Sequence, residues 1–140
     1  MESVRSGLAA AGGILGVGAD MVEIARIQRL ALSYGDKFLN RVFTAGERSC
    51  CEARRDACAC YAARFAAKES VLKALGTGLA GCRWTDVEVV RPADGRPEVV
   101  LRGGAADLAR RGRVERVLVS LSHDRGRALA FAVAIGGGGK

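Results

Sequence analysis

Residues 63–78 read ARFAAKESVLKALGTG, a run of strong helix formers that ends in Gly-Thr-Gly. Small and apolar residues dominate the run, as in a helix packed tightly in a core, and yet Lys68, Glu69 and Lys73 interrupt its inner turns. At 100° per residue, Glu69 and Lys73 share one narrow stripe with Ala62 and Ala66. Alanines allow another backbone to approach closely, and a carboxylate among them needs a positive partner, because an unpaired buried charge is costly. The sequence around this helix must therefore supply that partner.

The composition is that of an ordinary globular protein. The 140 residues suffice for one domain with a single core, and 49% of them are hydrophobic while 26% are charged. No apolar run reaches the ~20 residues that cross a bilayer, and no signal peptide is convincing, so we expect a cytoplasmic protein that does not bind membranes.

The net charge of +7 predicts an anionic partner. Aromatic residues make up only 5% of the chain, and no basic run is interleaved with them as a base-stacking surface would require. The pattern therefore argues against nucleic acid as that partner.

Four of the five cysteines gather between positions 50 and 60, in the pattern CC-x6-C-x-C. Structural zinc sites pair their cysteines as CxxC, and the only histidine lies far along the chain. The spacing favours reduced thiols that behave as small hydrophobic residues over a metal cluster.

The order of apolar patterns predicts an α+β fold. Residues 14–22 alternate apolar and small side chains as a buried strand does, and from Glu23 the spacing becomes helical. TDVEVV and PEVVL predict one hairpin, and VERVLVSLS and RALAFAVAI predict a second. Because hairpins require antiparallel pairing, we expect a mostly antiparallel sheet with helices packed on one face.

Helix boundaries follow from local signals. Residues 44–47, TAGE, resemble a capping box that opens a helix, and a long helix is expected over residues 57–75. We expect a flexible arm over residues 1–13, the domain over residues 14–135 and a flexible tail over residues 136–140.

A second carboxylate, Asp20, ends the segment GVGAD of the first expected strand, whose glycines allow close backbone approach. Asp20 could simply cap the helix that begins near Glu23, and Glu69 could form a local ion pair with Lys73 worth only ~0.2–0.5 kcal/mol. The alternative is a joint site, in which Asp20 and Glu69 hold Mg²⁺ and Lys73 pairs with a phosphate. The glycine loop of residues 76–78 would then let a phosphate ligand approach without Cβ hindrance.

Other catalytic motifs find little support. Gly-Thr-Gly is no Walker loop, because its glycines follow the helix instead of preceding it. The lone histidine, His123, lies in SLSHD at a hairpin mouth, and the absence of a GxSxG elbow argues against a Ser-His-Asp hydrolase.

Three blocks in order, GVGADMVEIARI, RFAAKESVLKALGTG and SLSHD, resemble the signature of the holo-acyl-carrier-protein synthases, the short type of 4′-phosphopantetheinyl transferase. FLNRVFTAGE also fits that pattern, and the resemblance extends from about Ile14 to Ile135, with the cysteine-rich region outside it. It implies the phosphopantetheinyl transferase fold, assembled as a homotrimer whose active sites are shared between neighbouring chains. It also implies Mg²⁺-dependent transfer of 4′-phosphopantetheine from coenzyme A to a serine of a carrier protein, with release of adenosine 3′,5′-bisphosphate.

The resemblance assigns roles to individual residues as well. Asp20 and Glu69 match the Mg²⁺ ligands, and Lys73 matches the lysine that faces the phosphates of coenzyme A. These three residues form the expected catalytic group. Positions that line the nucleotide site are matched by Arg64, Gly76, Thr77, Pro97 and His123. Positions that dock the carrier are matched by Arg26 and Arg41.

The charge of the chain agrees with that function, because acyl carrier proteins are strongly acidic. A different class of function stays open at this point: a basic binding module for nucleic acid or an anionic protein, in which Asp20 and Glu69 are merely structural.

Overall fold

The computed structural model describes residues 13–76, 80–92 and 95–137. The elements follow one another as β1 (Ile14–Glu23), α2 (Ile24–Tyr34), α3 (Asp36–Val42), α4 (Ala45–Glu52), α5 (Ala57–Ala74), the 3-10 turn η1 (Trp84–Asp86), β2 (Val87–Val90), β3 (Glu98–Leu101), α6 (Gly103–Arg111), β4 (Val114–His123) and β5 (Arg127–Gly136). The predicted α+β class and both predicted strand pairs are confirmed.

The strands form two antiparallel sheets instead of the single sheet expected: one of order β1-β5-β4 and one of β2-β3. Side chains occupy the edge of β2 that faces away from β3. Val89 N donates to the Glu47 carboxylate at 2.7 Å, and Val87 O accepts a hydrogen bond from Lys68 Nζ. Because these backbone groups on β2 are bonded to side chains, they are not available for pairing with a further strand.

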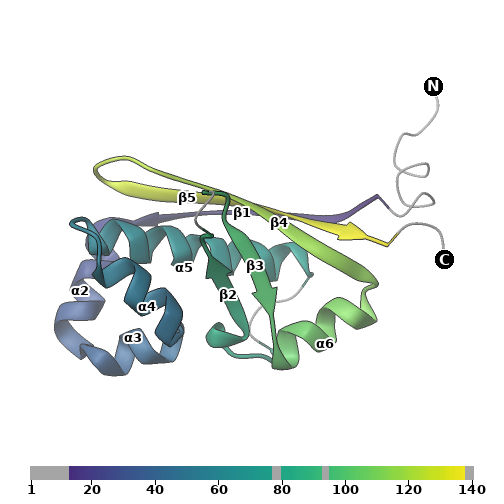
Figure 1. Cartoon of the computed structure of the whole chain (residues 1–140), viewed down its shortest axis with the longest axis horizontal. Coiled ribbons are helices and arrows are strands. Elements are labelled where there is room, and N and C mark those ends of the chain that lie inside the picture. Colours follow the sequence, from purple (N-terminus) through teal and green to yellow (C-terminus); the bar gives the residue numbers. More distant parts are fainter. Residues whose placement is uncertain (1–12, 77–79, 93–94, 138–140) are drawn as a thin grey trace.

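Helix α5 lies along one face of the three-stranded sheet, with α2, α3 and α4 gathered at one end (Figure 1). Strand β1 approaches α5 so closely that a Cβ at Gly16 or Gly18 would lie 2.0 Å from a carbonyl oxygen of the helix. The close backbone approach predicted from GVGAD is therefore confirmed, and its partner is α5 itself.

The opposite face of the sheet is apolar and, within the described residues, uncovered by any element. This outer face is defined by Val17, Met21, Leu118 and Phe131, whose side chains are 66%, 57%, 48% and 54% exposed. The strand register places all four on the same side, away from α5. Contiguous apolar surface of this kind marks an interaction site.

Local signals in the sequence are mostly realised. Thr44 and Glu47 form the predicted capping box at the start of α4. Gly76 has a φ of +84°, a conformation that favours glycine just after a helix, so its position ends α5. The interpretation of Asp20 as a helix cap is wrong, because Asp20 stays within β1 and Glu23 precedes α2 without any side-chain capping bond.

The helices of the described residues are all too short or too polar to cross a bilayer. The expected arm and tail, except for Gly13, Gly136 and Gly137, lie outside the described residues, as does Thr77.

Candidate active site

Asp20, Glu69 and Lys73 come together where β1 crosses α5, and we refer to them as the carboxylate group. Lys73 Nζ donates to Ala19 O at 2.9 Å and lies 3.4 Å from Asp20 Oδ1. Burial raises the pKa of Glu69, and the nearby negative charge of Asp20 raises it further. The prediction that these three residues share one place in the fold is confirmed.

The local ion pair between Glu69 and Lys73 is not the arrangement that the structure shows. Among the ion pairs of the described residues, Lys73 has Asp20 as its partner and none joins it to Glu69. Lys73 remains near enough for its charge to oppose the rise in the pKa of Glu69. The lysine side chain is 53% exposed, so its ammonium can still bind a ligand from solvent.

The carboxylate group suits Mg²⁺ by the chemistry of its donors. Mg²⁺ takes oxygen ligands, and it commonly accepts one or two protein carboxylates while water and phosphate complete its shell. No three Asp, Glu, His or Cys side chains within the described residues are arranged as a full metal site, so the protein would supply two ligands at most here. A cation between Asp20 and Glu69 would also offset the repulsion that raises the pKa of Glu69.

Arg64 and His123 line a second place, a cavity of about 90 Å³ between α5 and β4. The Arg64 side chain is buried, and its Nε has no hydrogen-bond partner among the described residues. Pro97 lines an adjoining cavity of about 340 Å³, and Arg91 and Leu121 belong to the walls of both. The structure therefore brings Arg64, His123 and Pro97 into one neighbourhood that is rich in positive charge.

Within a single chain, the cavities lined by Arg64, His123 and Pro97 lie apart from the carboxylate group. Arg64 and Glu69 are five residues apart on α5, which places them about 140° apart around the helix. Gly76 lies near Lys73 at the far end of α5, about 18 Å along the helix axis from Arg64. Strands β1 and β4 are the two edges of the sheet, about 9.6 Å apart across β5. The predicted nucleotide-binding residues thus fall into two groups.

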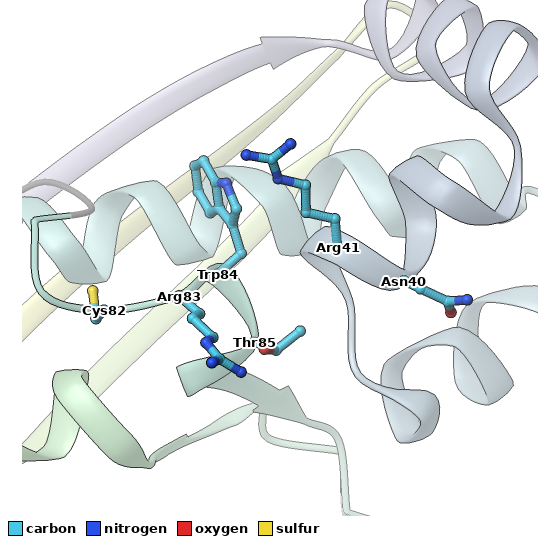
Figure 2. A pocket seen from close by; sticks show the side chains of 6 residues that line it. All are labelled: Asn40, Arg41, Cys82, Arg83, Trp84 and Thr85. Atoms are coloured by element: carbon cyan, nitrogen blue, oxygen red, sulfur yellow. The ribbon is translucent and has the colours of Figure 1, made fainter.

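Arg26 and Arg41 flank a pair of stacked aromatic rings. Arg26 Cζ lies 5.7 Å from the centroid of the Phe65 ring, which lies 5.0 Å from that of Trp84. Figure 2 shows the Trp84 indole beside the Arg41 guanidinium, at a cavity of about 460 Å³ that both residues line. We call these four residues the arginine–aromatic surface. The two rings thus link Arg26 to Arg41, whereas a common docking surface for the carrier stays a prediction.

Neither Phe65 nor Trp84 was identified as a functional residue from the sequence. Phe65 is a buried residue of α5, as an apolar residue in a core helix is expected to be. Trp84 follows the glycine loop in a short turn that has no regular pattern. The one available signal is that Trp84 is the only tryptophan in the chain.

Lys68, the remaining charge in the opening stretch, belongs to neither group. Its Nζ lies 2.8 Å from Glu47 Oε1, and both side chains are fully buried. Lys68 also donates to the carbonyls of Trp84 and Val87, while Glu47 accepts from the backbone of Thr44 and Val89. The pair joins α4, α5 and β2, and its bonds use all three donors of the Lys68 ammonium, which leaves that lysine none for a ligand.

Comparison with known proteins places these features in a family. Residues 16–132 match the profile of the 4′-phosphopantetheinyl transferase superfamily. The holo-[acyl-carrier-protein] synthase of Desulforudis audaxviator is 53% identical over 123 residues, which cover 88% of this chain and 94% of that protein.

Solved structures agree with that match. The crystal structure of the holo-[acyl-carrier-protein] synthase from Neisseria meningitidis has a TM-score of 0.79 and 32% identity, covering 86% of this chain and 98% of the other. The Helicobacter pylori enzyme in complex with coenzyme A has a TM-score of 0.75 and 28% identity, over 84% of this chain and 98% of the other.

Proposed function

The chain belongs to the 4′-phosphopantetheinyl transferase superfamily, as an enzyme of the holo-[acyl-carrier-protein] synthase type, and we propose that it modifies an acidic acyl carrier protein in the cytoplasm. In the proposed reaction the serine hydroxyl of the apo carrier gives up its proton to a base or to water, and its oxygen bonds to the phosphorus that bears pantetheine. The bond from that phosphorus to the bridging oxygen breaks, and adenosine 3′,5′-bisphosphate leaves with the electron pair. The juxtaposition of Asp20, Glu69 and Lys73 is the observation that carries this proposal.

Asp20 and Glu69 would hold Mg²⁺, and Mg²⁺ when bound neutralises phosphate charge during such transfers. Lys73 would contribute a second positive charge, since its half-exposed ammonium can reach a phosphate oxygen while it keeps its bond to Ala19 O. Fixed positive charges at a transferring phosphorus stabilise the transition state more than the substrate. The backbone around Gly76 would leave room for the ligand next to Lys73.

Arg64 and His123 would bind the nucleotide part of coenzyme A. The orphaned Nε of Arg64 supports an anion in this cavity, because a buried donor without a partner is costly unless a ligand satisfies it. Pro97 would lie beside the adenine from the adjoining cavity.

A homotrimer would reunite the two groups of residues. The carboxylate group and the Arg64 cavity lie on different sides of α5, so one ligand meets both most readily where two chains join. The outer face offers an apolar surface for that contact, centred on Phe131 and Leu118. Phe131→Asp should therefore yield monomers in sedimentation analysis and lose transfer, whereas a trimeric Phe131→Asp protein would place the contact elsewhere.

The arginine–aromatic surface would receive the carrier. Arg26 lies close enough to Glu69 for its charge to lower that carboxyl's pKa, so a carrier bound there would present its serine near the carboxylate group. Opposite charges mainly accelerate and orient such encounters.

The decisive experiment incubates the full chain with coenzyme A, Mg²⁺ and an apo acyl carrier protein, and measures the mass of the carrier. The carrier should gain one phosphopantetheine, and adenosine 3′,5′-bisphosphate should appear in equal amount. A carrier that binds but keeps its mass, with or without Mg²⁺, would instead identify a binding module without catalysis.

A further inference from the structure

Cys51 on α4 and Cys60 on α5 meet in the interior, beside the Arg64 cavity. Their sulfurs are 2.6 Å apart, and the Cys51 thiol donates to the Cys60 sulfur. Both side chains are buried, with exposures of 0% and 6%. A small shift of either side chain would bring the sulfurs to the ~2.05 Å of a disulfide bond.

The Arg64 guanidinium donates hydrogen bonds to Cys60 and Cys50, whereas Cys51 feels its charge without a hydrogen bond from it. Arg64 Nη1 donates to Cys60 Sγ at 2.9 Å, and Nη2 donates to Cys50 Sγ at 3.3 Å. The hydrogen bond from Cys51 and the charge of Arg64 outweigh burial and lower the pKa of Cys60 to about 7. The same hydrogen bond, together with burial, raises the pKa of Cys51. The hydrogen bonds from Cys51 and Arg64 both point to the Cys60 sulfur, so Cys60 is the better placed of the two to carry negative charge.

A small molecule can reach the reactive sulfur. Cys60 lines the cavity of about 90 Å³ that also contains Arg64 and His123. The thiolate, not the thiol, is the species that peroxides oxidise, and sensitive cysteines combine a low pKa, access from solvent and a nearby second cysteine. For the buried Cys60 this cavity is the route of access.

We propose that Cys60 and Cys51 form a peroxide-sensitive modification site that closes a reversible disulfide between α4 and α5. The Cys60 thiolate attacks one oxygen of a hydroperoxide, its O–O bond breaks, and with one proton taken up the products are Cys60 sulfenic acid and water or an alcohol. Cys51 then attacks the sulfenic sulfur, its thiol proton leaves with the hydroxyl as water, and the disulfide forms. The two thiols lose two electrons and the peroxide gains them, and a dithiol reductant reverses the change.

The test uses the folded full chain with a small excess of hydrogen peroxide, followed by alkylation of the remaining thiols and tryptic digestion. Trypsin cleaves after Arg48, Arg54, Arg55 and Arg64, so Cys51 falls in residues 49–54 and Cys60 in residues 56–64. A cross-link between these two peptides, lighter than their sum by two hydrogen atoms and removed by dithiothreitol, is the expected product. Cys82 should stay alkylated and serves as an internal control.

Matched variants identify the two sulfurs. Cys50→Ala with Cys58→Ala removes the neighbouring cysteine from each peptide and should leave the yield of cross-link within twofold of wild type. Cys51→Ala should abolish the cross-link and leave Cys60 as a sulfenic acid that dimedone traps.

Two results would overturn the proposal. If Cys51 and Cys60 are still free thiols after peroxide treatment of the Cys50→Ala, Cys58→Ala double variant, the pair is inert. A cross-link that persists in Cys51→Ala would show that Cys50 is the partner of Cys60 instead.

Discussion

Two lysines on α5, five residues apart, are paired with carboxylates in opposite ways. Lys68 is fully buried, lies 2.8 Å from Glu47, and bonds to two carbonyls besides. Lys73 is 53% exposed, lies 3.4 Å from Asp20, and has the partly buried Glu69 nearby without an ion pair to it. A complete set of partners holds three elements of the fold together, whereas an incomplete set leaves charge available for a ligand. The completeness of pairing thus separates structural from functional charges on one helix.

The largest effect on stability is expected at the completed pair. Lys68→Met leaves Glu47 buried without its counter-charge, and breaking such a pair costs about 3–5 kcal/mol of unfolding free energy. Urea unfolding measures the loss. Lys73→Met is the matched control, because an exposed ion pair contributes about 1 kcal/mol or less. Equal unfolding free energies of the two variants would contradict the distinction between a structural Lys68 and a functional Lys73.

The next largest effect is expected on the rate of phosphopantetheine transfer, when a carboxylate of the carboxylate group is removed. Glu69→Gln and Asp20→Asn should each reduce the rate at least about 100-fold, the scale seen when one group that stabilises transition-state charge is removed. The folded state should persist in both variants, because neither carboxylate completes a buried pair. Glu98→Gln, a change of an exposed carboxylate on β3, should leave the rate unchanged. A site variant with near-normal activity at low Mg²⁺ would disprove the role of that carboxylate.

A smaller effect is expected on carrier recognition. Arg26→Glu with Arg41→Glu reverses charge on the arginine–aromatic surface and should raise the KM for the carrier about tenfold, since charge mainly steers association. The KM for coenzyme A should hardly move, because Lys73 and the carboxylates are unchanged. Arg110→Glu with Arg111→Glu changes net charge equally at exposed positions on α6 and is the control. An equal rise in the KM for the carrier in both double variants would show that the overall charge of the protein, and not this surface, causes the effect.

The smallest effect concerns stability and pH. The folded state raises the pKa of Glu69 above its usual 4.5, so ionised Glu69 destabilises the wild type as pH rises through that raised value. Without metal, Glu69→Gln should therefore have a slightly higher Tm than wild type at neutral pH and the same Tm below about pH 4. Mg²⁺ should raise the Tm of the wild type and not that of the variant. A lower Tm for Glu69→Gln at neutral pH would contradict this electrostatic picture.

The sequence predicted local features well because their causes are local. The capping box of Thr44 and Glu47, the hairpins and the glycines of β1 each follow from a few neighbouring residues. The carboxylate group was also predictable, since Asp20 and Glu69 each sit in a distinctive motif. The partner of Lys68 was not, because Glu47 already had a local role and its second role depends on how α4 packs against α5.

The division of the strands into two sheets could not be predicted from the sequence for a similar reason. The strand patterns of β2 and β3 predict pairing with each other, but not that Glu47 and Lys68 take the backbone groups by which β2 could pair further. Likewise, no spacing rule indicates that Arg64 faces two cysteine sulfurs. These contacts join residues that only the tertiary fold brings together.

We propose that Glu69 of one chain works with Arg64 of a neighbouring chain, and a mixing experiment tests this arrangement most directly. Glu69→Gln and Arg64→Met proteins are each expected to be almost inactive alone. After they are unfolded and refolded together in equal amounts, sites built between chains should recover about one quarter of wild-type activity, because each site draws its two halves independently. No recovery in mixed trimers verified by mass would show that both residues act within one chain, and would contradict the account.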